Sequence, residues 1–380
     1  MTLAVQDTVF SHPWVNQLPA DFYRQPAKIK KGFDPAMSVT VGVDLMIRTG
    51  LSMVMAGLSV PSGYSGTKLL SLLEQDSPLS SLSDEALFHR PRPAPDLNTI
   101  EADRPKGVEG GIFEKLEWKS AYQWKNGAQP SNNDQVVAWY WRHDNTPRPT
   151  ILLVHGFLAP WWEVNEFYLG IRFLYNLGCD VVLKTLPHHG PRARSAKRIS
   201  GIGFFSGGVE ELNHAVLQST YDIRTLVDVL QQSGVERIGI SGVSLGGYTT
   251  ALIAGLDNRF EFAMPLVPLV SIPDAMMEWK PLDRVAKTIM GRYGVTMQQL
   301  RNTMAFHSPL SRPVQLPADR LLIIAGKGDC LASPRHSETL QQHWGGCQLH
   351  WYAGAHALPR QQNQTNQVKQ AFLQRIGFVA

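Results

Sequence analysis

The sequence predicts an α/β fold in which a mainly parallel, doubly wound sheet is covered by helices on both faces. From about residue 110 onward, apolar runs of strand length alternate with longer segments of helical character. Some runs are apolar without interruption, as at 150–154, which is typical of central parallel strands buried on both faces. A length of 380 residues is ample for one large domain of this kind with an additional layer.

The composition is that of a compact globular protein. Hydrophobic residues make up 43% of the chain and charged residues only 18%, below the usual ~25%. The net charge of +4 is small for this length and no zinc-finger or RNP-like signature is present, so no nucleic-acid partner is expected. Three cysteines, Cys179, Cys330 and Cys347, do not make a disulfide framework. Because the first residues contain neither a basic nor an apolar leader segment, we expect a cytoplasmic protein.

Residues 1–110 are predicted to form an N-terminal extension, whose main element is an apolar helix over 36–60. Asp44, Arg48 and three glycines in this helix argue against a membrane span. The two charges are four residues apart, so they can neutralise each other on the helix surface. We expect a helix packed on the protein, with homodimerisation or contact with a membrane surface through 36–60 as functional alternatives.

The catalytic domain is predicted over 111–380, after a Pro-rich strap at 90–95. Its first two strands, 113–124 and 136–142, alternate in polarity as antiparallel strands do. The strands that follow are expected at 150–154, 180–186, 236–241, 260–270, 320–325 and 348–352. The helices are expected at 161–177, 209–232, 247–255, 334–344 and 361–378, with a Met-rich helical segment at 273–307 as a candidate cap.

One short motif joins a predicted strand to a predicted helix. Gly242-Val-Ser-Leu-Gly246 follows an apolar run and precedes a segment that can open a helix. A strand that enters a helix through G-x-S-x-G is a nucleophile elbow, whose sharp turn strains the serine backbone and exposes the serine hydroxyl at the top of the sheet. Glycines are needed on both sides because side chains there would collide with the neighbouring strand and helix. Ser244 is therefore the candidate nucleophile.

A serine hydroxyl needs a base beside it and a group that orients the base. In a doubly wound sheet, such groups lie in loops at the carboxyl ends of strands. Asp329 follows the second-last expected strand and His356 follows the last one, in the chain order Ser, Asp, His. Asp274, which follows an earlier strand, is the alternative acid.

From about residue 110 to the end, this order of strands and motifs resembles the α/β-hydrolase superfamily. The resemblance implies Ser244 as nucleophile, His356 as general base and then acid, and Asp329 as the orienting carboxylate. It implies no cofactor and no metal.

The turn after the strand 150–154 is similar to the His-Gly oxyanion turn of this superfamily. The implied donors to a developing oxyanion are the backbone N–H groups of Phe157 and Leu245. The run His-Gly-Phe-Leu departs from the His-Gly-Gly-Gly run of some lipases and esterases.

Three other features have plainer interpretations. His188 and His189 are expected in a structural loop, because no carboxylate or cysteine lies beside them at metal-ligand spacing. The basic residues of the same loop are expected on a solvated face, with attraction of an anionic substrate or a lipid head group as the alternative; they are Arg192, Arg194, Lys197 and Arg198. The methionines of 276–304 serve either core packing or an adaptable acyl pocket.

The sequence thus predicts a serine hydrolase that cleaves a small-molecule carboxylic ester through an acyl-enzyme intermediate. The same residues would also suit a thioesterase, a peptidase or amidase, or an acyltransferase. A further alternative is a catalytically silent α/β-hydrolase that acts as a binding protein.

Overall fold

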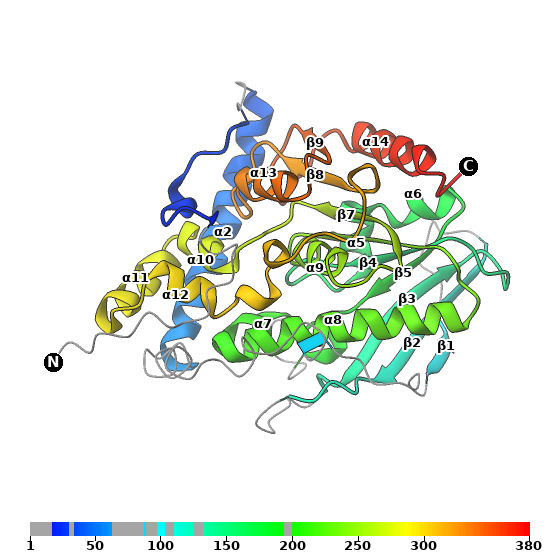
Figure 1. Cartoon of the computed structure of the whole chain (residues 1–380), viewed down its shortest axis with the longest axis horizontal. Helices are drawn as coiled ribbons and strands as arrows, with labels where there is room; N and C mark the ends of the chain where they lie inside the picture. Colours follow the sequence, from blue (N-terminus) through cyan, green and yellow to red (C-terminus); the bar gives the residue numbers. More distant parts are fainter. Residues whose placement is uncertain are drawn as a thin grey trace.

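A single mixed sheet organises the part of the chain that the computed structural model describes, which comprises residues 17–29, 34–62, 87–88, 97–102, 110–124, 132–193 and 200–380. Its nine strands follow the order β1-β2-β3-β5-β4-β6-β7-β8-β9 (Figure 1). The first four strands of this order pair antiparallel, and from β5 to β9 all pairs are parallel. The expectation of a mainly parallel sheet is confirmed. The expected strap at 90–95 lies outside the described residues, as do Arg194, Lys197 and Arg198.

The strands agree closely with the apolar runs of the sequence. They are β1 Asn98–Glu101, β2 Ile112–Lys119, β3 Gln135–Arg142, β4 Thr150–Val154, β5 Asp180–Lys184, β6 Ile238–Val243, β7 Phe260–Leu266, β8 Leu322–Gly326 and β9 Gln348–Tyr352. β7 is shorter than the expected 260–270, since the chain turns at Val267 with φ 43°. β1 lies before the predicted domain boundary at 110 but pairs with β2, so the sheet begins earlier than that boundary.

Helices cover both faces of the sheet. They are α2 Pro35–Ser62, α5 Trp162–Leu169, α6 Ile171–Asn176, α7 Ile202–Ser206, α8 Val209–Gln232, α9 Leu245–Ala254, α10 Ile272–Glu278, α11 Leu282–Tyr293, α12 Met297–Asn302, α13 Pro334–His343 and α14 Gln362–Arg375. Leu152 and Val154 of β4 pack in one core with α8 and α9, while Ile151 and Leu153 pack in another with α5, α6 and α14. Alternate side chains of a buried strand point to opposite faces, which explains the unbroken apolar run.

Two expected helices are divided in the structure. The segment 161–177 forms α5 and α6 because Gly170 adopts φ 74° between them. The segment 273–307 forms α10, α11 and α12, which pack beside one another and beside the site. Of its methionines, Met276 lines the main pocket, while Met277 and Met304 are buried and Met290 and Met297 pack against the core. The segment therefore contributes to core packing, and Met276 also lines the pocket; an acyl-binding role stays a prediction.

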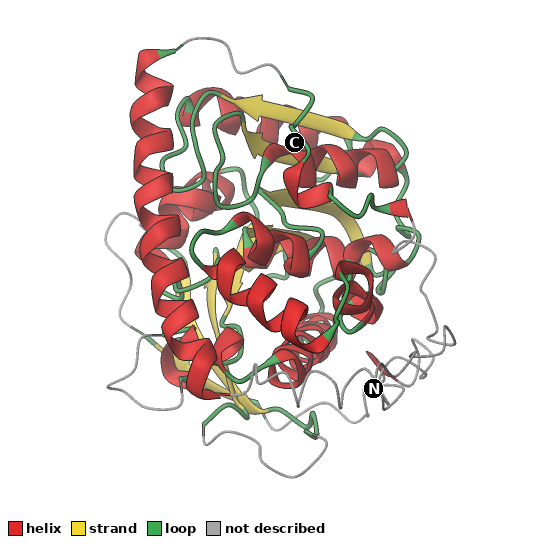
Figure 2. Ribbon diagram, turned by 90° about the vertical axis from the view of Figure 1, so that its left-hand side faces the viewer, coloured by secondary structure: helices red, strands yellow, loops and turns green. Residues whose placement is uncertain are grey.

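Helix α2 runs along the outside of the molecule and packs against α7 and α11 (Figure 2). Among the described residues it alone is long and apolar enough to cross a membrane, over Pro35–Gly57. Its inner face includes polar side chains and its outer face includes apolar ones: Asp44 and Ser52 have no exposed surface, while Met46 and Met53 are 70% and 60% exposed. The expectation that Asp44 and Arg48 neutralise each other on the helix surface is wrong, because backbone groups of a distant loop bind both side chains. The expected membrane or dimer contact through 36–60 stays a prediction.

Candidate active site

Ser244 stands at the turn between β6 and α9. Its backbone has φ 58° and ψ −113°, a conformation that L-residues rarely adopt and that costs roughly 1–3 kcal/mol. The turn is held by the Ser244 amide, which donates to the Leu266 carbonyl at 2.9 Å. A Cβ atom at Gly242 would strike the backbone of Gly246, and one at Gly246 would strike the backbone of Val154. Both glycines are therefore required for the close approach of strand, turn and helix.

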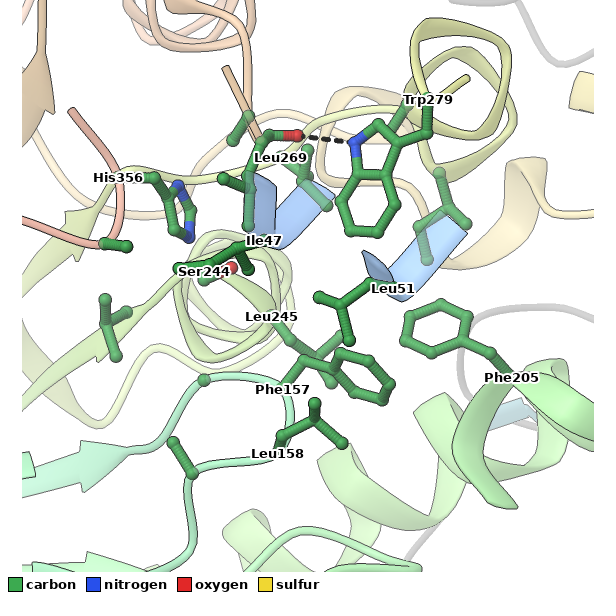
Figure 3. Close-up of a pocket in the computed structure, with 18 of the residues that line it drawn as sticks. Ile47, Leu51, Phe157, Leu158, Phe205, Ser244, Leu245, Leu269, Trp279 and His356 are labelled. Carbon is green, nitrogen blue, oxygen red and sulfur yellow. Dashed lines mark hydrogen bonds between the residues drawn. The ribbon is translucent and has the colours of Figure 1, made fainter. Parts of the chain in front are cut away.

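The structure brings Asp329 and His356 together in adjacent loops after β8 and β9. His356 Nδ1 lies 2.7 Å from Asp329 Oδ2. The other oxygen, Asp329 Oδ1, accepts hydrogen bonds from the amides of Leu331 at 2.9 Å and Ala332 at 2.7 Å. The carboxylate is thus held at both oxygens, which fixes the orientation of the imidazole ring. In Figure 3 that ring points towards the Ser244 hydroxyl.

The electrostatic setting of His356 suits a base. Burial acts to lower the pKa of its imidazole, but the negative charges of Asp329 and then Asp44 outweigh this effect and raise the pKa above its ordinary value. An imidazolium formed during a reaction would therefore be stabilised where it forms.

Asp274, the alternative acid, is bound elsewhere. Its two oxygens pair with the Arg301 guanidinium at 2.6 and 2.9 Å, and Ser271 Oγ donates to it at 2.5 Å. Arg301 also donates to the carbonyl groups of Leu18 and Pro19. Asp274 therefore ties α10, α12 and the N-terminal segment together instead of orienting the histidine.

The turn after β4 runs beside the nucleophile. A Cβ atom at Gly156 would lie 3.5 Å from Ser244 Cβ, and the next turn residue but one, Leu158, has φ 65°. His155 Nε2 accepts from the Leu186 amide at 3.0 Å, so its proton is on Nδ1, which donates to the Gly156 carbonyl at 2.7 Å. Burial, and then the neighbouring His189, lower the pKa of His155 well below its ordinary value, which keeps this tautomer neutral.

The two candidate oxyanion donors, Phe157 and Leu245, both line the pocket that contains Ser244. Leu245 is the first residue of α9, and the first N–H groups of a helix have no partner within the helix. Phe157 lies in the turn beside Ser244 and lines the same pocket. These are the two residues that the sequence indicates as oxyanion donors.

The loop after β5 is structural in the part that the structure describes. His189 is fully buried, its Nδ1 donates to the Pro187 carbonyl, and burial lowers its pKa to about 4. The expectation that Arg192 lies on a solvated face is wrong, since it is fully buried and pairs with Asp222 at 2.8 Å. Asp222 also lies 3.6 Å from the equally buried Lys184. This ion cluster explains why a basic residue occurs in the middle of the fold.

An apolar cavity of about 270 Å³ opens directly from Ser244 and His356 (Figure 3). Its described lining contains no Asp, Glu, Lys or Arg side chain. The Tyr168 hydroxyl donates to the Ala357 carbonyl at 2.7 Å and the Trp279 indole donates to the Leu331 carbonyl at 2.9 Å, so both polar groups are already used. The walls come from segments that lie far apart in the chain, and their large apolar side chains include Ile47, Leu51, Met55, Phe157, Leu158, Phe205, Leu269, Met276 and Trp279.

Sequence reasoning missed the contribution of α2 to this site. Ile47, Leu51 and Met55 recur every four residues and form one wall of the cavity. Their spacing is visible in the sequence as a helical stripe, but nothing local shows that the stripe faces a pocket formed by residues more than 100 positions away. The lone buried acid Asp44 was the better signal, because a carboxylate within an apolar helix needs partners.

Comparisons with known proteins agree with this architecture. Residues 218–374 match the prolyl oligopeptidase family, Peptidase_S9. An uncharacterized protein of Mycobacterium tuberculosis is 30% identical over 261 residues, which cover 65% of this chain and 59% of that protein. The chain therefore aligns with less than two thirds of that relative.

Solved structures share the fold at low sequence identity. An acetyl xylan esterase from a Paenibacillus species superposes with a TM-score of 0.56 and 17% identity, over 77% of this chain and 92% of that one. The acylaminoacyl peptidase of Pyrococcus horikoshii superposes with a TM-score of 0.52 and 18% identity, over 71% of this chain and 42% of that one. Similarity at this level concerns the fold.

Proposed function

We propose that this chain, which has the α/β-hydrolase fold, is a serine hydrolase that cleaves carboxylic esters with apolar acyl groups. The supporting observation is the cavity beside Ser244, whose described lining is apolar and carries no charged side chain of Asp, Glu, Lys or Arg. Each methylene buried there contributes about 0.8 kcal/mol. An acyl chain is therefore the substrate part that this cavity stabilises best.

In the proposed reaction, Ser244 Oγ attacks the ester carbonyl carbon while His356 Nε2 takes the hydroxyl proton. The amides of Phe157 and Leu245 donate to the oxygen that becomes negative. The tetrahedral intermediate collapses, the C–O bond to the alcohol breaks, and His356 returns the proton to that alcohol. A water molecule then attacks the acyl-enzyme, again losing its proton to His356, and the acid leaves as Ser244 recovers the proton. Asp329 holds the imidazole in the required tautomer throughout.

A peptidase role is the second candidate, because the matching family and one structural neighbour are peptidases. A peptide with a free α-amino group presents a cation near its scissile bond, which a buried site must pair with a carboxylate. The described lining of the cavity offers none. We therefore favour an uncharged acyl group, joined to an alcohol or a thiol.

The test is hydrolysis of p-nitrophenyl esters from acetate to decanoate by wild type and by Ser244→Ala. We expect kcat/KM to rise about 4-fold per methylene until the cavity is full, since 0.8 kcal/mol corresponds to that factor. Ser244→Ala should abolish turnover. An acyl thioester and an acylated amino acid p-nitroanilide, tested at the same chain length, distinguish thioesterase and amidase activity from esterase activity.

Two substitutions of the same kind test the cavity itself. Met55→Trp fills the cavity and should shift the optimum to shorter chains, whereas Met53→Trp, on the outer side of α2, should leave the optimum in place. Identical profiles for the two variants would contradict an acyl role for this cavity. A wild type that a fluorophosphonate labels at Ser244 but that cleaves no ester has a different substrate. A wild type that is not labelled is a silent hydrolase fold.

A further inference from the structure

The carboxylate of Asp44 joins the two loops that carry the candidate acid and base. Asp44 Oδ2 accepts from the amide of Cys330 at 3.0 Å and from the amide of His356 at 2.8 Å. Asp44 Oδ1 accepts from the amide of Ala357 at 2.8 Å. One side chain of α2 therefore binds the residue directly after Asp329 in the chain, His356 itself, and the residue after His356.

Among the residues that the structure describes, no cation pairs with this carboxylate, and three backbone amides bind it instead. Asp44 has no exposed surface, and burial of an isolated carboxylate is costly. The three backbone donors offset that cost, because hydrogen bonds to an ionised group are about twice as strong as neutral ones. Arg48, one helical turn further along, donates to the Cys330 carbonyl at 3.1 Å, so α2 binds both the amide and the carbonyl of Cys330. An apolar residue would suffice if α2 only needed to pack here.

We propose that Asp44 is a positioning residue of the active site, which fixes the loop of Asp329 and the loop of His356 relative to each other and to Ser244. The proposal rests on the proposed serine hydrolase function. We call the three hydrogen bonds that Asp44 accepts from these loops the Asp44 clamp. Without it, the two loops would still share the Asp329–His356 hydrogen bond and backbone hydrogen bonds such as that from the amide of Gly328 to the carbonyl of Gly354. Displacement of reacting groups by about 1 Å can cost about 10²-fold in rate.

The charge of Asp44 acts in the same direction as the charge of Asp329. Both carboxylates raise the pKa of His356. Two tyrosines also lie near the loop of His356. Burial raises the pKa of Tyr168 to about 12 and holds the pKa of Tyr352 well above its ordinary value, so both stay neutral near pH 7. Removal of the charge at Asp44 should therefore lower the pKa of His356, while a purely structural defect should leave it unchanged.

The test compares Asp44→Asn with Asp257→Asn. Asp257 is also a buried acid, 3% exposed, but it binds Arg224 and Arg259 near the amino end of β7, away from the carboxyl ends of the strands. For Asp44→Asn we expect kcat to fall about 10²-fold with KM little changed. The acidic limb of the kcat/KM profile should move to lower pH, and fluorophosphonate labelling of Ser244 should slow by the same factor. Asp257→Asn should lose stability but keep the acidic limb of wild type.

Several results decide the matter. Folded Asp44→Asn with the kcat and acidic limb of wild type overturns the proposal, as does an equal response of the two variants. Asp44→Glu keeps the charge but is one methylene longer, so it should keep the acidic limb and lose rate; full activity of this variant also counts against the clamp.

In wild type, the amides of Cys330, His356 and Ala357 should exchange their hydrogens slowly although they lie in loops, and rapid exchange overturns the proposal even if no variant folds. A wild type that fluorophosphonate does not label would instead refute the proposed function.

Discussion

Replacement of Asp329 by Asn tests how the acid controls the histidine. Asp329 Oδ1 accepts from the amides of Leu331 and Ala332, so the amide oxygen of an Asn side chain is held at the same place. The opposite orientation leaves two buried N–H groups without an acceptor, at a cost of at least about 2 kcal/mol, which corresponds to about 30-fold in population. The amino group of the Asn side chain then faces His356 Nδ1.

An amino group can only donate, so His356 Nδ1 must accept and the ring proton moves to Nε2. In that tautomer Nε2 cannot take the proton of Ser244. We expect Asp329→Asn to lower kcat for a p-nitrophenyl ester by about 10⁴-fold while the melting temperature changes little. The rate of fluorophosphonate labelling should fall in parallel.

Asp274→Asn is the comparison variant for this experiment. It weakens the buried pair with Arg301, so we expect a loss of about 3–5 kcal/mol in the free energy of unfolding, with kcat of the folded protein close to wild type. Asp329→Asn within 10-fold of wild type would refute the reasoning. A folded Asp274→Asn that loses 10⁴-fold would assign the acid role to the other carboxylate.

The remaining predictions concern protonation, the elbow and the outer face of α2. Because the raised pKa of His356 belongs to a base that must be neutral, kcat/KM should fall as pH drops through an apparent pKa above 6.5, measured as the acidic limb of the profile. Gly246→Ala should lower the free energy of unfolding in urea by about 1–3 kcal/mol through collision with β4, whereas Gly291→Ala, in open space on α11, should raise it by up to about 1 kcal/mol. If α2 contacts a membrane surface, Met46→Glu should abolish flotation with phospholipid vesicles and Ile100→Glu should not; a change in sedimentation without flotation indicates a dimer instead.

The candidate site was predictable because each of its three candidate catalytic residues lies in a recognisable local sequence pattern. Ser244 lies between two glycines at a strand–helix junction, and that pattern has few other uses. Asp329 and His356 each follow a strand of a parallel sheet, and the carboxyl ends of parallel strands meet at one edge. Chain order, strand periodicity and the resemblance to the α/β-hydrolase superfamily therefore predicted that these three side chains lie together.

The environment of the site was not predictable in this way, because it depends on contacts between distant segments. Nothing near Asp44 in the chain shows that its partners are amides 286 and 312 residues later. Arg192 illustrates the same limit, since a basic residue in a loop is ordinarily solvated and only the fold reveals the buried Asp222 beside it.

By itself, the sequence determined the fold class, the strands of the sheet and the three candidate catalytic side chains, since local periodicity and turn chemistry encode them. Only the tertiary structure decided that α2 lines the cavity and that its Asp44 binds the loops of Asp329 and His356. It also decided that Asp274 forms an ion pair with Arg301. The physical reason is that a buried polar group is satisfied by whichever partner the fold brings within hydrogen-bonding distance, and separation along the chain does not specify that partner.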